Sequence, residues 1–141
     1  MENVLKDIIQ GISNSYSEEF FTAITLQLDR VIQSDFTFIA RLDLSRNLSK
    51  TVALVNNGQV LDNFEYALNH TPCADVANDS ICIYSSHVTD TFPNDQLLID
   101  MGIEGYLGTP LHNSDGNVMG LVVALYNKPI VDQEMTLALF Q

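Results

Sequence analysis

The sequence predicts an α+β domain, in which a central antiparallel sheet carries helices at both ends of the chain. Three observations support this fold class. Apolar residues with helical spacing fill residues 1–32, stretches rich in β-formers follow one another over 36–126, and the last two stretches flank a short Asp-Gly loop. Strands that follow one another in this way favour an antiparallel sheet over alternating parallel units. At 141 residues the chain has the size of one domain.

Two helices are predicted at the N-terminus. The first covers residues 1–12, and Gly11 with the polar residues after it should end this helix. Ser15 and Glu18 have the spacing of a capping box and predict a second helix that stops near Ser34. The apolar face of the first helix consists of Met1, Val4, Leu5, Ile8, Ile9 and Ile12.

Six stretches are expected to form strands, each rich in β-formers or bounded by turn residues. They are residues 36–42, 50–55, 59–64, 80–85, 105–112 and 118–126. The last stretch is apolar at successive positions, so we expect its sheet to be covered on both faces.

Shorter elements lie between the strands. Thr71 followed by a proline predicts the start of a short helix over 73–78. Residues 87–93 are expected to form a loop, and residues 95–101 a helix. Residues 132–140 begin a helix with no stop signal, so we expect the chain to end inside a truncated helix.

The charge balance excludes several classes of function. Acidic residues outnumber basic ones 18 to 6, which gives a net charge of −12 and disfavours binding to nucleic acids or anionic membranes. Apolar runs are too short for a membrane span, the N-terminus is too polar for a signal peptide, and two cysteines do not make a disulfide scaffold. We therefore expect a cytoplasmic protein. Residues 51–127 contain nine Asp or Glu and no Lys or Arg, which limits the ligands that a site there can hold.

Four segments resemble the GAF domain, and most closely the GAF modules fused to bacterial histidine kinases and diguanylate cyclases. They are YALNHTPC at 66–73, FPND at 92–95, GYLGTPL at 105–111 and DGNVMG at 115–120. The resemblance covers about residues 17–141. It implies a central antiparallel sheet with the terminal helices on one face and a small-molecule pocket, roofed by short helices and loops, on the other.

The resemblance implies a regulatory module rather than an enzyme. We expect residues 1–14 to form an amphipathic helix for dimerisation and signalling, and 15–141 to form the GAF domain. The partners expected are an unidentified small molecule, a second copy of the chain and an output domain in the same parent chain. A simpler alternative is that the first helix only packs on the sheet. The ligand-binding residues expected at family positions are Cys73, Val76, Phe92, Asp95, Leu98, Met101 and Tyr106.

Cys73 supports a competing hypothesis. At the second position of its predicted helix, backbone N–H groups and the helix dipole favour a thiolate, which suits a redox switch or a thiol enzyme. The alternative is a small buried apolar residue. Cys82 alternates with isoleucines in a predicted strand and is interpreted as core. We expect both residues to be thiols without a disulfide.

Cofactor sites are not predicted. His70, Cys73, Cys82 and His87 are all residue types that bind zinc, but their spacing matches no common zinc module. Residues 98–103 lack the cysteine of the GAF-fold free methionine sulfoxide reductases and the Cys-His arrangement of bilin-binding GAF domains. We therefore expect neither that enzyme nor a covalent bilin.

The ligand itself is only partly constrained. Asn127 and Lys128 resemble the start of the cyclic-nucleotide GAF motif, but the residues that should follow are absent. Without Lys or Arg near the expected pocket, a ligand should be neutral, cationic, or a small anion held by backbone N–H groups. A third possibility is a dimerisation scaffold without a ligand.

Overall fold

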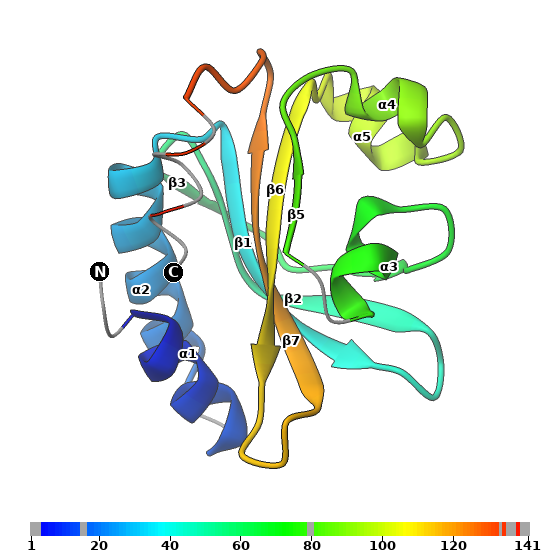
Figure 1. The fold of residues 1–141 in the computed structure, drawn as a ribbon. Helices are drawn as coiled ribbons and strands as arrows, with labels where there is room; N and C mark the ends of the chain where they lie inside the picture. Colours follow the sequence, from blue (N-terminus) through cyan, green and yellow to red (C-terminus); the bar gives the residue numbers. More distant parts are fainter. Residues whose placement is uncertain (1–3, 15–16, 79–80, 133, 135–137, 139–141) are drawn as a thin grey trace.

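A seven-stranded antiparallel sheet separates two layers of helices in the computed structural model of this chain (Figure 1). The residues described are 4–14, 17–78, 81–132, 134 and 138. The strand order is β3-β2-β1-β7-β6-β5, and β4 pairs with β2 beside β3. The strands are β1 Phe36–Asp43, β2 Leu48–Asn56, β3 Gln59–Leu61, β4 Glu65–Ala67, β5 Cys82–Tyr84, β6 Gly105–His112 and β7 Val118–Tyr126. The predicted α+β fold is confirmed.

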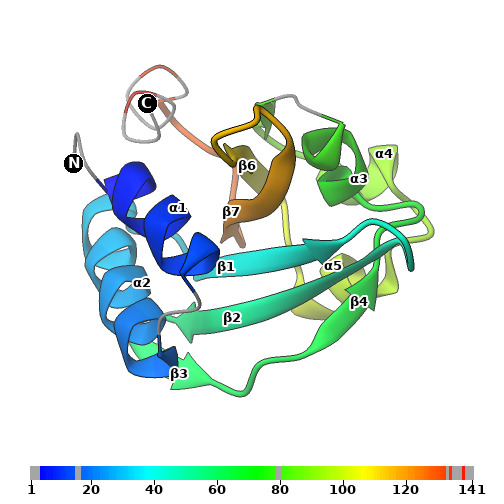
Figure 2. The same cartoon turned by 90° about the horizontal axis from the view of Figure 1, so that it is seen from below.

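The helices divide between the two faces of the sheet. α1 (Val4–Ser13) and α2 (Glu18–Ile32) lie side by side on one face, as Figures 1 and 2 show. The short helices α3 (Pro72–Ala77), α4 (Val88–Thr91) and α5 (Gln96–Met101) lie on the other. No helix in the described part of the chain is long and apolar enough to cross a membrane.

β7 connects two hydrophobic cores, one on each face. Val122, Ala124 and Tyr126 pack in the core under α1 and α2. Leu121, Val123 and Leu125 pack in the core under α3, α4 and α5. Because successive side chains of a strand point to opposite faces, a strand covered on both sides must be apolar throughout. The prediction for this strand is confirmed.

Several local expectations need correction. α2 is capped by Ser17, whose Oγ accepts a hydrogen bond from the Phe20 N–H group; Ser15 lies outside the described residues. The strand expected at 59–64 ends at Leu61, and β4 (Glu65–Ala67) is a further short strand that the sequence did not predict. Between the two, Thr51 holds the backbone of Phe64: its N–H group donates to the Phe64 carbonyl, and its hydroxyl accepts from the Phe64 N–H group. Both short strands pair with β2, at its two ends.

Other corrections concern the short helices and the chain ends. The expected loop at 87–93 contains α4, a single turn with Val88 as its only buried residue, too short to show an apolar periodicity. The strand expected at 80–85 is shorter and begins at Cys82. Most of the helix expected at 132–140 falls outside the described residues.

α1 packs on the sheet of its own chain. Ile8 and Ile12 are buried in the same core as α2, while the side chains of Val4 and Leu5 are outside the described part. Gly11 lies inside the helix rather than ending it. The approach of α1 depends on Gly120, where an added Cβ would stand 2.7 Å from the Ala40 carbonyl oxygen and 3.1 Å from the Ile12 side chain.

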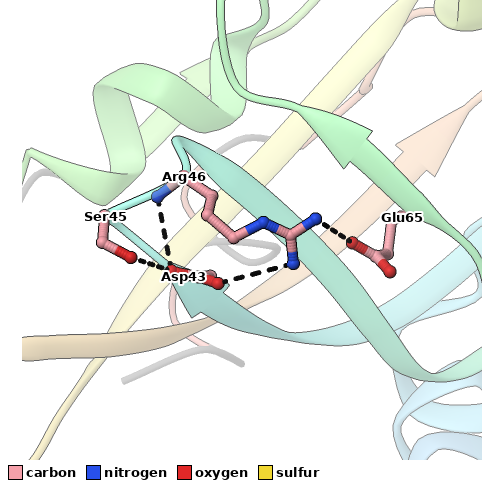
Figure 3. A network of polar contacts seen from close by, with 4 residues as sticks. All are labelled: Asp43, Ser45, Arg46 and Glu65. Atoms are coloured by element: carbon pink, nitrogen blue, oxygen red, sulfur yellow. Dashed lines mark hydrogen bonds and ion pairs between the residues drawn. The ribbon is translucent and has the colours of Figure 1, made fainter.

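A polar network at one end of the sheet links the β1–β2 turn to β4 (Figure 3). The Ser45 hydroxyl donates to Asp43 at 2.7 Å, and Arg46 lies 3.7 Å from Asp43 and 3.9 Å from Glu65. The hydrogen bond from Ser45 is the main cause that lowers the pKa of Asp43. These exposed ion pairs add little stability, and the second one connects the turn to β4, the strand that carries Tyr66.

Gly120→Ala should destabilise the domain. The new methyl group must displace either the backbone of β1 or α1, which should lower the free energy of unfolding by about 1–3 kcal/mol. Urea denaturation monitored by circular dichroism measures this value. Ser114→Ala, in the exposed turn of the same hairpin, is the control and should change little. Equal stability of both variants would contradict the close approach of α1.

Asp43 should titrate below the ordinary carboxyl value. Because its pKa is lowered in the folded state, its contribution to stability is present above the unfolded pKa and is lost as the pH falls through the folded one. NMR titration of the side-chain carboxyl measures the midpoint. Ser45→Ala should raise this midpoint, and Arg46→Gln should raise it less. An unchanged midpoint in Ser45→Ala would be inconsistent with the network.

Candidate functional site

A cavity of about 170 Å³ lies between the sheet and the loops and helices of the second layer. Its floor comes from β1, β2, β6 and β7, and its walls come from β4 and from the starts of α3 and α5. The lining residues are Phe38, Leu54, Phe64, Tyr66, Ala67, Asn69, Thr71, Pro72, Cys73, Asn94, Asp95, Gln96, Leu97, Leu98, Met101, Tyr106 and Leu125. The cavity lies where the resemblance to the GAF domain implies a pocket, on the face opposite the N-terminal helices and under the short helices and loops.

Tyr106 forms part of the cavity floor and is almost completely buried. Its ring lies over Gly108, where an added Cβ would stand 2.8 Å from the Tyr106 hydroxyl and 2.9 Å from Val76. A side chain at Gly108 would therefore displace either the tyrosine or α3. The tyrosine hydroxyl and the Cys73 sulfur form a hydrogen bond of 3.0 Å.

Cys73 is held between two tyrosines. Tyr66, on β4, donates a hydrogen bond of 3.2 Å to the Cys73 sulfur, which also bonds to the Tyr106 hydroxyl. Burial raises the pKa of Cys73 to about 11 and holds the pKa values of Tyr66 and Tyr106 well above their ordinary value. All three groups are therefore protonated near neutral pH.

The thiolate hypothesis for Cys73 is not supported by this environment. α3 does begin at Pro72, with Thr71 before it, as the sequence predicts. However, the Thr71 hydroxyl donates to the Leu68 carbonyl instead of capping the helix. The two tyrosine hydrogen bonds lower the thiol pKa, but the cost of burying a charge is larger, so burial outweighs the position at the helix start.

Asp95 directly precedes the first residue of α5 and is only 8% exposed. Its Oδ1 accepts a hydrogen bond of 3.2 Å from the Leu98 N–H group, which makes it the N-cap of this helix. Burial raises the pKa of Asp95, although the N–H groups of Leu97 and Leu98 oppose this shift. Asp95 therefore adds a carboxyl group to a lining whose other side chains are apolar or neutral and polar.

Five of the seven predicted ligand-binding residues line the cavity: Cys73, Asp95, Leu98, Met101 and Tyr106. Val76 and Phe92 do not. Val76 is buried under α3 beside Gly108, and Phe92 packs edge-on against Tyr84 with ring centroids 5.4 Å apart. Whether any of the seven binds a ligand stays a prediction.

Sequence reasoning missed the part of the lining that comes from the strands, notably Phe38, Leu54, Tyr66 and Leu125. The signal was present for the strand residues, because Phe38 and Leu125 alternate with residues of the other core. Which of the two faces carries the cavity was not readable from that alternation. Tyr66 belongs to β4, a strand of three residues that the sequence did not predict.

The four zinc-type residues do not form a metal site. His87 lies 3.5 Å from Asp90 and 3.8 Å from Glu104, whereas Cys73 contacts the two tyrosines. Among the residues that the structure describes, no three His, Cys, Asp or Glu side chains are arranged to hold a metal ion. Neither cysteine forms a disulfide.

Comparison with known families agrees with this architecture. The sequence model of the GAF domain matches residues 17–141. The chain belongs to the GAF domain family. Its GAF domain is 23% identical over 126 residues to the diguanylate cyclase DgcP of Escherichia coli (strain K12), covering 87% of this chain. That alignment spans only 37% of the cyclase, so the chain corresponds to about a third of that relative.

Solved GAF domains share the fold at low sequence identity. The phycocyanobilin-bound GAF domain of a cyanobacterial phytochrome superposes with a TM-score of 0.70 at 17% identity, covering 99% of this chain and 87% of the other. The A. aeolicus nlh2 GAF domain in an inactive state gives a TM-score of 0.67 at 16% identity, covering 99% and 85%. These similarities extend over the sheet and both helical layers.

Cys73 should resist thiol reagents in the folded protein. With a pKa of about 11 and 4% exposure, it offers almost no thiolate near neutral pH. Labelling with iodoacetamide at pH 7.4, followed by peptide mass spectrometry, should modify the half-buried Cys82 first and Cys73 only after denaturation. The Cys82→Ala variant should label slowly. Labelling of native Cys73 at the rate of a small free thiol would revive the redox hypothesis.

Proposed function

We propose that this GAF domain is a regulatory module that binds a small molecule in the cavity between its sheet and α3 and α5. The cavity carries the proposal because it combines apolar walls with buried hydrogen-bonding groups on Tyr66, Cys73 and Tyr106. Such a combination is typical of ligand pockets, where a few polar groups orient a ligand within an apolar enclosure.

The sheet offers a direct route from the cavity to the N-terminal helices. Phe38 lines the cavity, and its neighbour Thr37 donates a buried hydrogen bond of 3.0 Å to Asp29 in α2. On β7, Leu125 lines the cavity while Ala124 packs under the helices. A ligand that shifts these strands would therefore shift α2 with them. We propose that this movement is the output signal.

The parent chain would receive the signal through an output domain. The similarity to a diguanylate cyclase favours a cyclase output, and a histidine kinase is the other output that the family resemblance suggests. In this proposal the GAF domain has no catalytic residues of its own. A homodimer is also proposed, but Ile8 and Ile12 are buried on the sheet of their own chain, so a dimer through α1 must use its other residues.

A bilin, as bound by the phytochrome relative, does not fit this cavity. Pockets for drug-sized ligands start at about 300 Å³, whereas this cavity has about 170 Å³. Cys73, the cysteine that lines it, is a buried, protonated thiol and is poorly suited to covalent attachment. We therefore assign the site to a much smaller molecule.

Closing the cavity entrance should abolish ligand binding. Leu97 lines the cavity and Ile99 does not, although both are on α5 and are 39% and 42% exposed. A thermal-shift screen of compounds below ~200 Da, the size that an enclosure of this kind admits, should give stabilising hits for the native chain and for Ile99→Trp. Leu97→Trp should lose these hits at unchanged intrinsic stability. Hits that survive Leu97→Trp would place the ligand elsewhere, and a scaffold without a ligand would give none.

A further inference from the structure

The cavity has an unusual charge pattern. Asp95 is the one acidic side chain among the described lining residues, and no Lys, Arg or His lines the cavity with it. The other polar lining side chains are neutral. They are the Cys73 thiol, the hydroxyls of Tyr66, Thr71 and Tyr106, and the amides of Asn69, Asn94 and Gln96. A ligand that enters therefore meets a carboxylate that none of the described lining residues neutralises with a positive charge.

The walls suit a flat ring. Phe38 and Tyr66 meet edge to face with centroids 6.1 Å apart, and Phe64 lies 5.7 Å from Tyr66. All three rings line the cavity. Aromatic faces attract organic cations, because the π-electrons place negative potential above the ring. The aromatic wall and the carboxylate thus favour the same sign of ligand charge.

The volume limits the ligand to about one ring. An apolar cavity of about 150 Å³ is large enough for benzene, and this cavity has about 170 Å³. A single six-membered ring with a small substituent fills it. Nucleotides and other phosphorylated molecules are excluded both by size and by the absence of a lining cation.

We propose that the cavity binds a small organic cation, a single aromatic ring carrying an amine or amidine group whose N–H donates to the Asp95 carboxylate. This inference rests on the proposed function, since it names the ligand class of the same cavity. The ring packs against Phe38, Phe64 and Tyr66, and the cationic group compensates the buried carboxylate. A charge-assisted hydrogen bond of this kind is stronger than one between neutral groups.

The competing explanation is that Asp95 only caps α5. Asparagine caps helices about as well as aspartate does. Asp95→Asn therefore keeps the hydrogen bond to the Leu98 N–H group and removes the charge. If Asp95 serves only as a cap, this variant binds ligands as the native chain does. Asp95→Ser is a second capping variant, in case the amide does not fit the site.

Three probes of nearly equal shape test the ligand charge: benzamidine, benzamide and benzoate, which are cationic, neutral and anionic at pH 7. NMR titration of the intact domain measures each dissociation constant. We expect benzamidine to bind about tenfold more tightly than benzamide and benzoate to bind most weakly. Asp95→Asn and Asp95→Ser should remove the advantage of benzamidine. Asp100→Asn removes an exposed carboxylate from the same helix and should preserve it.

The outcomes separate the two proposals. Equal binding of benzamidine and benzamide by the native chain, or an advantage of benzamidine that persists in both Asp95 variants, overturns the ligand class but leaves the cavity as a binding site. Failure of all three probes to bind at millimolar concentration, with no shifts at Tyr66, Leu98 or Tyr106, overturns the ligand class. The proposed function is overturned with it only if the thermal-shift screen also gives no hits.

Discussion

The packing of β7 on both faces is the constraint on which the rest of the structure depends. Residues 121–125 of this strand are almost completely buried, and each contributes to one of the two cores. Because a strand alternates its side chains, the cavity and the N-terminal helices share one backbone. The sheet is therefore both the floor of the site and the support of α1 and α2.

Two glycines of the sheet allow side chains of both helical layers to pack closely against it. The absence of a side chain at Gly108 leaves room for Tyr106, whose hydroxyl bonds to Cys73. The absence of a side chain at Gly120 leaves room for Ile12 of α1. Both glycines belong to the same hairpin, on opposite faces. The hairpin thereby positions both the polar groups of the cavity and the end of α1. Because side chains in a well-packed interior have little room to move, a displacement of the hairpin on one face affects the other.

The hairpin was predictable to the residue, and the reason is physical. Its strands are long and rich in β-formers, and its loop contains an Asp-Gly signal, so local pattern and tertiary pairing agree. β4 and α4 lacked such agreement. β4 has three residues and α4 has four, and partners distant in sequence hold them. β4 pairs with β2, and the Val88 N–H group of α4 donates to the Glu104 carbonyl. The position of Cys73 at a helix start was also readable, but its thiol state was not, because burial depends on Tyr66 and Tyr106.

The contrast between local pattern and distant contacts also explains which properties of the site could be predicted from the sequence. Composition alone showed that residues 51–127 lack cations, and this property carries directly into the cavity. Only the fold showed that, of the nine acidic residues in that stretch, Asp95 alone lines the cavity among the residues described. Its cost of burial is partly offset by two N–H groups of α5, so the carboxylate is tolerated without a protein cation. The positive charge that balances the Asp95 carboxylate would therefore come from the proposed ligand.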